Sequence, residues 1–567
     1  MTIESTRRGP TVPALAGMVL ANPLAPLALV VALGIFGMLV QLSRPLGHDV
    51  GWLLIVTDRL LAGADVYGRD VFEWNAPANL YILTPSVAIG RLFGVSLVTT
   101  ARVEVALLAA GCLLLCGAVL RGLLGRDRAL ESGTVLAALA FALFVFVDEA
   151  FGQREHLVAM LALPQALVVA ARLDCHRRNG LERANGHDQP EGHGRSDGRA
   201  ADDVGRRVAV LAGIAAATAI CIKPQYALIW LVWEVALATR TRTLRVWRRP
   251  DWLAASAVGV VYLVSIWLVT PGWLTTMLPL ALDSYWVYQS SFGSVVQARD
   301  LALLGLTLCV FPVVRGRPEL VACAAVLWLT GAGFYLISVL HQTGWRYHVL
   351  PFQVCMIVLV SLALARGVGA FAQRLPEPST ALRITCAVVV GSVALSAFLV
   401  TPNRYSDVVR AGAAWRAGGT AGPIGRLERF LRQHAGDGSV YVVNLSMAGL
   451  FPAFNHAGVE WSSRFPVLHL PVAIVRQRAG GEGVPARLTD GRVAEIEAYL
   501  RDAVIEDLRR RPADLILIEH LPRRRFFAGA RFDFLEFLLE DARFAEIWSG
   551  YEAIAGVGRF DAWRAIE

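Results

Sequence analysis

Residues 206–239 read RRVAVLAGIAAATAICIKPQYALIWLVWEVALAT, two apolar runs separated by Lys223 and Pro224. Pro224 has no N–H to donate and disfavours helix in the residue before it, so we expect the chain to turn between the runs. Basic segments precede the first run and follow the second, so the start of the first run and the end of the second lie on the same side of a membrane. The stretch therefore predicts a membrane hairpin with Lys223, the one lysine of the chain, at its tip.

The composition extends this pattern to most of the chain. Its 567 residues are 55% hydrophobic, and the mean hydropathy is +0.50. Repeated uncharged stretches of roughly 15–22 residues are candidate membrane helices. The net charge of +8 comes mainly from arginine in the segments between apolar runs, without the interleaved aromatic residues of a nucleic-acid site. The sequence therefore predicts a polytopic α-helical membrane protein that contacts membrane lipids and no nucleic acid.

The distribution of arginine predicts the topology. Basic segments face the cytoplasm by the positive-inside rule, and they lie at 121–128, 172–207, 239–249, 315–317 and 366–383. The outward segments are then 43–96, 148–156, 223–225, 271–298 and 341–348. Roughly eleven spans result, at 24–42, 97–120, 130–147, 157–171, 208–222, 226–238, 252–270, 300–314, 319–339, 349–365 and 384–401.

The predicted topology divides the chain into three regions. Residues 1–23 form a cytoplasmic N-terminus, because the first apolar run is long enough to remain as an uncleaved helix. Residues 24–401 form the transmembrane domain, with juxtamembrane helices in the first outer loop (43–96) and a disordered cytoplasmic loop at 172–207. Residues 402–567 form an extracytoplasmic α/β domain, periplasmic in a Gram-negative cell.

Hydrophobic periodicity predicts the elements of this outer domain. They are buried strands at 439–445 and 514–520, amphipathic helices at 493–511 and 532–542, and closing strands at 544–550 and 551–563. The eight cysteines of the chain lie before this domain, with neither metal-ligand nor disulfide spacing. Cys175 falls in a predicted polar loop, and the other cysteines fall in or beside apolar runs. The residues themselves therefore predict no metal site.

Ionisable residues gather in the segments predicted to face outward. They are His48, Asp49 and Glu73 in the first loop, Arg154, Glu155 and His156 in the second, and Arg346, Tyr347 and His348 before the span at 349–365. Solvated loop charge is one interpretation of these groups, and binding of a polar headgroup is the other.

Lys223 is a candidate for a functional role. A lysine at membrane depth costs several kcal/mol unless it is paired or faces water. The alternative is a lysine at a helix end whose ammonium reaches the interface. Arginine binds phosphate bidentately and lysine binds it as a point charge, so Lys223, Arg346 and His348 are predicted to form an anion pocket.

Several motifs of the chain resemble one enzyme family. They are GHDVGW at 47–52, LLAGADVYGRDVFEWNAPANLYILTP at 60–85, RLFGVSLVTTAR at 91–102, QREHL at 153–157, CIKPQ at 221–225 and WRYHVLP at 345–351. In this order, and on a common outward side, they resemble the GT-C integral-membrane glycosyltransferases, in particular the bacterial family 39-like group. That group includes the aminoarabinose transferases of lipid A and is related to protein O-mannosyltransferases. The resemblance covers residues 24–401.

The resemblance implies a GT-C fold and an inverting enzyme of the inner (plasma) membrane. It implies transfer of a sugar from a polyprenyl-phosphate donor, on the outer face, to a glycolipid, polysaccharide or protein acceptor. Asp49 would be the catalytic base and Glu155 the second acid. Lys223 and Arg346, with His348 beside them, would hold the donor phosphate. The substrate-binding residues would be His48, Glu73, Arg154, His156 and Tyr347.

Two departures from the family pattern bear on specificity. The second acid is Glu155 where relatives more often have aspartate, and residues 75–77 read NAP where close relatives often have Lys-Pro-Pro. The second departure argues against aminoarabinose as the sugar. A divalent metal is the one cofactor that the resemblance allows, since some relatives use one.

Two other function classes stay open at the level of sequence. A transporter or flippase for lipid-linked precursors would carry charges deep in several central helices and an inverted repeat. A non-catalytic assembly protein would not need acids and cations on one common face.

Overall fold

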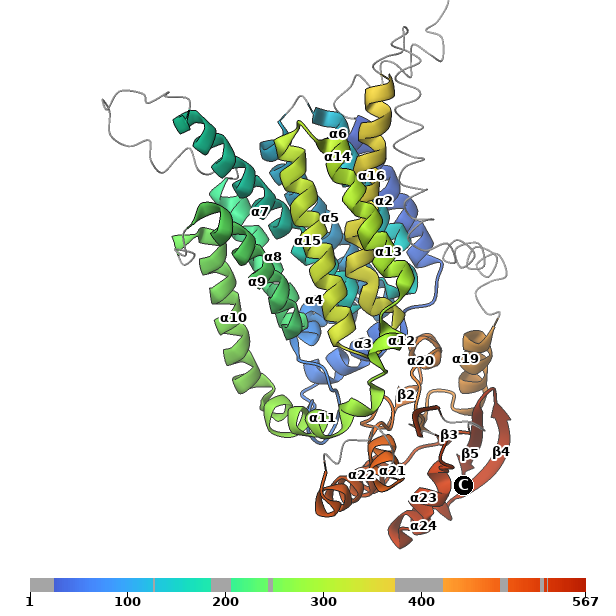
Figure 1. Cartoon of the computed structure of the whole chain (residues 1–567). Helices are drawn as coiled ribbons and strands as arrows, with labels where there is room; N and C mark the ends of the chain where they lie inside the picture. The colour runs from blue at the N-terminus through green and yellow to red at the C-terminus, as the bar shows by residue number, and fades with distance from the viewer. Residues whose placement is uncertain are drawn as a thin grey trace, which may run out of the picture. The chain divides into compact units, whose positions relative to one another are not determined.

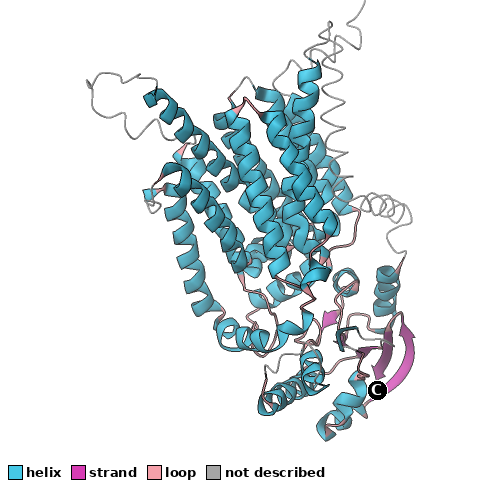
Figure 2. Cartoon of the chain, viewed as in Figure 1, coloured by secondary structure: helices cyan, strands magenta, loops and turns pink. Residues whose placement is uncertain are grey.

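The computed structural model describes residues 25–125, 128–184, 205–242, 248–372, 422–479, 488–520, 525–527 and 529–566. The chain divides into two compact units, each built from segments that lie far apart in the sequence. We call Met1–Leu42, Val105–Val260 and Phe292–Arg410 the helical unit, and Ser43–Glu104, Val261–Ser291 and Ala411–Glu567 the mixed unit. Helices dominate the described residues (Figure 1), and the strands come from the C-terminal part of the chain (Figure 2).

The hairpin predicted from residues 206–239 is present. α8 (Arg206–Ile222) ends where Lys223 adopts an extended backbone with φ −143° and ψ 100°. One turn of 3₁₀ helix, η4 (Pro224–Tyr226), follows and leads directly into α9 (Ala227–Thr241). Pro224 occupies the first position of this turn, where a missing N–H breaks no helical hydrogen bond.

Five helices of the described residues are long and apolar enough to cross a membrane. They occupy Leu97–Leu124, Arg154–Leu181, Pro250–Val269, Pro318–Leu340 and Arg346–Gly367, and shorter apolar helices occupy Leu27–Leu42 and Glu131–Phe146. The structural elements are α2 (Ala25–Leu42), α5 (Leu97–Leu124), α6 (Ala129–Phe141), η2 (Ala142–Phe146), α7 (Arg154–Ala184), α10 (Pro250–Val269), α13 (Ala298–Leu306), α14 (Val310–Val314), α15 (Pro318–Leu340) and α16 (Leu350–Ala372). They confirm the predicted class of polytopic helical membrane protein. The predicted span at 384–401 lies outside the described residues.

The loop predicted from residue 172 starts later than expected. α7 continues to Ala184, so Cys175 is a buried helical residue and its assignment to a loop was wrong. The carboxylate of Asp174 lies 3.1 Å from Arg177 and 2.9 Å from Arg178, one turn further along the helix. Such pairs stabilise a helix, so a segment rich in charge can remain helical. Residues 185–204 lie outside the described part of the chain.

The mixed unit contains a five-stranded sheet with the order β2-β1-β3-β5-β4. β1 pairs in parallel with β2 and β3, and β5 pairs antiparallel with β3 and β4. The strands are β1 (Ser439–Val443), β2 (Glu460–Trp461), β3 (Leu515–Glu519), β4 (Tyr551–Val557) and β5 (Phe560–Ala565), and the main C-terminal helices are α19 (Pro423–His434), α20 (Leu450–Ala457), α21 (Leu470–Ala479), α22 (Asp490–Arg510) and α23 (Phe534–Leu539). The strands predicted at 439–445, 514–520 and 551–563 are therefore confirmed.

The strand predicted at 544–550 was wrong. The structure has a helix there, α24 (Ala542–Trp548). The side chain of Asp541 accepts a hydrogen bond of 2.9 Å from the backbone N–H of Arg543, which caps the first turn. Phe544 is buried and its ring stacks on Trp548, one turn along the helix. Capping and this helical spacing outweigh the strand-like pattern of the segment.

The segment at 43–96, predicted to face outward, packs inside the mixed unit. It forms α3 (His48–Leu61) and α4 (Ala78–Phe93). The ring of Trp52, 1% exposed, lies 5.0 Å from that of Phe451 and 6.2 Å from that of Trp461. Gly51 permits this approach, because a Cβ at its position would lie 2.5 Å from the side-chain oxygen of Asn455. The loop and the C-terminal sheet region thus share one core.

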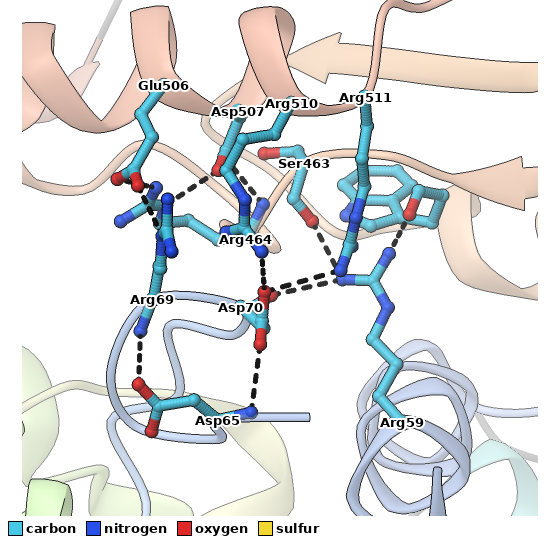
Figure 3. A network of polar contacts seen from close by, with 11 residues as sticks. Arg59, Asp65, Arg69, Asp70, Ser463, Arg464, Glu506, Asp507, Arg510 and Arg511 are labelled. Carbon is cyan, nitrogen blue, oxygen red and sulfur yellow. Dashed lines mark hydrogen bonds and ion pairs between the residues drawn. The ribbon is translucent and has the colours of Figure 1, made fainter. Parts of the chain in front are cut away.

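Polar contacts reinforce the same association (Figure 3). Arg59, on α3, donates a hydrogen bond of 3.2 Å to the carbonyl of Ser463. Asp70, in the loop after α3, accepts one of 2.9 Å from Arg510 at the end of α22. Residues about 400 positions apart in the sequence are therefore held together by charge-assisted hydrogen bonds.

Candidate active site

Glu155, Lys223 and His348 meet in the helical unit. Glu155 lies in the first turn of α7, Lys223 at the tip of the hairpin, and His348 in the 3₁₀ turn η9 (Arg346–Val349) before α16. Lys223 Nζ donates to Glu155 Oε1, and His348 Nε2 lies 3.3 Å from the same oxygen and 3.5 Å from Lys223 Nζ. The structure thus brings together three of the residues that the sequence singled out.

The three side chains are buried. Glu155 is 0%, His348 5% and Lys223 7% exposed. The second carboxylate oxygen, Glu155 Oε2, has no hydrogen-bond partner among the described residues. An unsatisfied buried carboxylate oxygen is costly, and it is an acceptor available to a substrate hydroxyl.

A hydrogen-bonded chain continues from His348. Its Nδ1 lies 2.9 Å from Thr343 Oγ1, which lies 3.3 Å from His341 Nδ1. Gln342, between His341 and Thr343, has φ 54°, a left-handed conformation that is uncommon outside glycine. This turn directs His341 and Thr343 to the same side. Sequence analysis missed Thr343, because nothing in its neighbourhood predicts a turn that brings it to a histidine five residues later.

The electrostatics of His341 show that cations surround this chain of contacts. Burial, followed by the charges of Lys223 and Arg154, lowers the pKa of His341 from 6.5 to about 4. Arg154 is 7% exposed and belongs to the same turn of α7 as Glu155. Lys223 and Arg154 thus place positive charge near the buried imidazole of His341.

The other predicted residues of the helical unit have different environments. Arg346 is exposed, two residues before His348. The ring of Tyr347 lies 4.6 Å from that of His348. His156 is completely buried, and its Nδ1 accepts a hydrogen bond of 3.0 Å from the backbone of Gly152, which braces the turn before α7.

Asp49, His48 and Glu73 belong to the mixed unit. Asp49 lies in the first turn of α3 with a side chain 13% exposed, and its Oδ1 is 3.6 Å from His48 Nε2. Glu73 is 4% exposed and accepts hydrogen bonds of 2.6 Å from Trp52 Nε1 and 2.8 Å from the backbone of Asn75. Its carboxylate thus holds the loop onto α3, whereas Asp49 lies at a helix start.

The described residues offer no ready metal site. No three histidine, cysteine, aspartate or glutamate side chains among them gather closely enough to hold an ion. The divalent metal that the resemblance allowed therefore has no ligand set in the described part of the chain, and we derive no step through one.

No family model and no curated protein sequence matches this chain. Among solved structures it is similar to ArnT from Cupriavidus metallidurans in the apo state, with a TM-score of 0.51 and 15% identity. That match covers 95% of this chain and 98% of the other. The fold is the GT-C membrane glycosyltransferase fold. The resemblance stated from the motifs is confirmed at the level of the fold, and the chain is a multi-pass membrane protein.

Two further solved structures match the chain with lower TM-scores. The arabinofuranosyltransferase AftD from Mycobacteria matches 95% of this chain and 40% of its own, at 16% identity and a TM-score of 0.40. An oligosaccharyltransferase from Archaeoglobus fulgidus matches 86% of this chain and 69% of its own, at 9% identity and a TM-score of 0.42.

Proposed function

We propose that this chain is a membrane glycosyltransferase that moves a sugar from a polyprenyl-phosphate donor to an acceptor hydroxyl. The observation that supports the proposal most is the buried cluster of Glu155, Lys223 and His348 in a GT-C fold. A polytopic protein with no enzymatic task has little reason to bury a lysine and a carboxylate at the end of a helical hairpin, since each costs several kcal/mol to desolvate.

The reaction that fits these groups is a single displacement at the anomeric carbon. The acceptor oxygen forms the new glycosidic bond as the bond between the sugar and the phosphate breaks. The polyprenyl phosphate leaves with one more negative charge, and the acceptor hydroxyl loses its proton. In this proposal Lys223 stabilises the developing phosphate charge, with Arg346 and His348 as further phosphate ligands.

Two carboxylates have proposed roles. Asp49 is the base that takes the hydroxyl proton, and its position at the start of α3 with a partly exposed side chain suits a group that must meet an acceptor. Glu155 orients the acceptor or the sugar through Oε2, its open oxygen. The donor and acceptor bind on the outer face of the inner membrane, with the C-terminal residues on that same side.

The first experiment measures transfer by the purified full-length chain in lipid nanodiscs. Pools of polyprenyl-phosphate sugars with a radiolabelled sugar are offered to the wild type, Asp49→Asn, Lys223→Ala and, as a matched surface control, Asp561→Asn, whose side chain is 55% exposed. We expect transfer by the wild type and the control, and a loss of about a hundredfold or more in the other two variants. The labelled product identifies the acceptor.

Two results would change the proposal. Equal transfer by wild type and Asp49→Asn would assign the base to another carboxylate, with Glu155 tested next. A well-folded wild type that transfers no sugar from any pool would argue against the enzyme and for a carrier of lipid-linked precursors.

A further inference from the structure

A second cationic position lies outside the candidate active site, in the mixed unit. Arg102, in the second turn of α5, is 7% exposed. Its Nη2 donates to the backbone carbonyl of Arg44, a residue that is itself 6% exposed. This contact joins the start of α5 to the segment that follows α2.

Arg102 lacks a counter-charge among the described residues. No ion pair joins it to a carboxylate there, and the acid two residues further along α5, Glu104, interacts with Ser86 on α4. A guanidinium has five N–H donors, and the contact with Arg44 uses one of them. A buried charge without a partner costs several kcal/mol, so an anion bound here would be strongly favoured.

The field of Arg102 reaches α20. Burial lowers the pKa of His456, while the charge of Glu428 raises it and those of Arg102 and Arg432 lower it. Glu428 pairs with Arg432 at 3.1 Å, so this carboxylate already has a partner. The charge of Arg102 is therefore felt on a second element of the mixed unit.

Exposed apolar side chains lie close to Arg102 in the sequence, within the same unit. Leu92 is 77%, Phe93 69% and Val103 46% exposed, all within about ten residues of Arg102 along the chain. Arg102 also lies close to the start of a helix long and apolar enough to span a membrane. In a membrane, the end of such a span is expected at the depth of the lipid headgroups.

We infer that Arg102 binds the phosphate of a membrane lipid, at a site separate from the cluster of Glu155 and Lys223. The guanidinium supplies bidentate hydrogen bonds to the phosphate, and the exposed apolar side chains contact the acyl chains. This inference does not depend on the proposed glycosyltransferase activity. A lipid that links α5 to the segment after α2 would stabilise the mixed unit at the membrane surface.

The test is lipid binding to the full-length protein in detergent, followed by native mass spectrometry and by thermal unfolding. The probes are dioleoyl phosphatidic acid, dioleoyl phosphatidylcholine and inorganic phosphate. Arg102→Gln keeps a donor for the Arg44 carbonyl but removes the charge. Arg102→Lys keeps the charge but removes the paired N–H donors of the guanidinium. Arg91→Gln is the matched control, since Arg91 is exposed and pairs with Asp58 at 2.6 Å in the same unit.

We expect phosphatidic acid, and not phosphatidylcholine, to bind and to raise the unfolding midpoint of the wild type and of Arg91→Gln. Affinity for phosphatidic acid should fall about tenfold in Arg102→Gln and less in Arg102→Lys. Equal affinity in Arg102→Gln and wild type would overturn the inference and leave Arg102 a purely structural donor to the Arg44 carbonyl. Inorganic phosphate that binds as tightly as phosphatidic acid would overturn the assignment to a lipid. If Arg102→Gln does not fold, the affinities of Arg102→Lys and Arg91→Gln for phosphatidic acid are compared instead. Equal affinities would then overturn the inference.

Discussion

The carboxylate of Glu155 and the imidazole of His348 face each other across 3.3 Å, although 193 positions separate them in the numbering. Lys223 Nζ contacts both groups, so an acid, a base and a cation from three elements share one buried position. Because each of these groups is costly to bury alone, the cluster is stable only as a set. Because the three groups stabilise one another, we expect substitutions here to affect stability and activity differently.

The first prediction is that replacing both Lys223 and Glu155 with apolar residues restores stability but not activity. Lys223→Met or Glu155→Leu alone leaves one buried charge without its partner, which should lower the free energy of unfolding by about 3–5 kcal/mol. The double variant replaces the pair with apolar side chains and should recover most of that loss. Sugar transfer should stay absent in all three. A double variant that transfers sugar would contradict the phosphate role of Lys223.

The second prediction uses the fact that Lys223 is the one lysine of the chain. Acylation of side-chain amines by a small amine-reactive ester can therefore be assigned to Lys223 without a background. We expect polyprenyl phosphate to protect Lys223, because the ester acylates the neutral amine, and a bound phosphate keeps the amine protonated and blocks the approach of the ester. The Glu155→Gln variant should be labelled faster than wild type in the absence of the lipid. Labelling unaffected by the lipid would place the donor phosphate elsewhere.

The third prediction concerns Thr343, which links His348 to His341. Thr343→Val removes both hydrogen bonds at nearly constant volume, and Thr343→Ser keeps them. The imidazole of His348 should then lose its fixed orientation, so the kcat for transfer should fall about tenfold, equivalent to 1.4 kcal/mol, with little change in KM. The pH profile of kcat should shift in the valine variant alone. Identical profiles for valine and serine would mean that the hydroxyl has no positioning role.

The fourth prediction is a pH dependence of stability that originates at His341. Burial and then the charges of Lys223 and Arg154 lower its pKa from 6.5 to about 4. The unfolded chain therefore binds a proton at higher pH than the folded one does. The stabilisation is fully present above about pH 6.5 and is lost as the pH falls towards 4, by at most about 3 kcal/mol.

The measurement is the thermal unfolding midpoint of wild type and His341→Gln between about pH 7 and about pH 5. The midpoint of the variant should fall less on acidification than that of wild type. His520→Gln is the control, since His520 is 55% exposed and pairs with Asp561 on the surface. If His341→Gln and His520→Gln respond equally to acid, His341 is not the source of the effect.

The fifth prediction concerns the ion pairs within the mixed unit. The Arg464 side chain is 5% exposed, and its Nε lies 2.8 Å from Asp507 and its Nη2 2.8 Å from Glu506. Arg464→Ala should cost about 3–5 kcal/mol, because it leaves Asp507 buried without its partner. Arg531→Ala breaks a pair in which the Arg531 side chain is 85% and the Glu536 side chain 67% exposed, and it should cost less than about 1 kcal/mol. Limited proteolysis of the full-length protein in detergent would reveal the difference as earlier cleavage in Arg464→Ala alone.

Local pattern predicted much of the helical unit. The hairpin around Lys223 follows from two apolar runs and one proline, and the spans at 97–120 and 319–339 match α5 and α15 within a few residues. Periodicity failed at residues 544–550, where a capping aspartate makes a helix from a segment that alternates like a strand. It also failed near Cys175, where ion pairs keep a charged segment helical.

The sequence predicted which residues belong to the candidate site, but not which of their side chains contact one another. Glu155, Lys223 and His348 stood out because each lies at an end of an apolar run that the distribution of arginine predicts to face outward. Their contact at a single oxygen depends on how α7, the hairpin and η9 pack, and no residue spacing encodes it. The same holds for Thr343, which depends on the left-handed turn at Gln342.

The sequence by itself determined that this protein is a polytopic membrane protein with Lys223 at a hairpin tip and an α/β region at its C-terminal end. Hydrophobic runs and turn residues act locally, so the order of amino acids is enough to specify them. Only the tertiary structure decided that Trp52 packs on Phe451, and that Glu155 meets Lys223 and His348. These contacts join distant parts of the chain, and their geometry arises from packing that no local pattern contains.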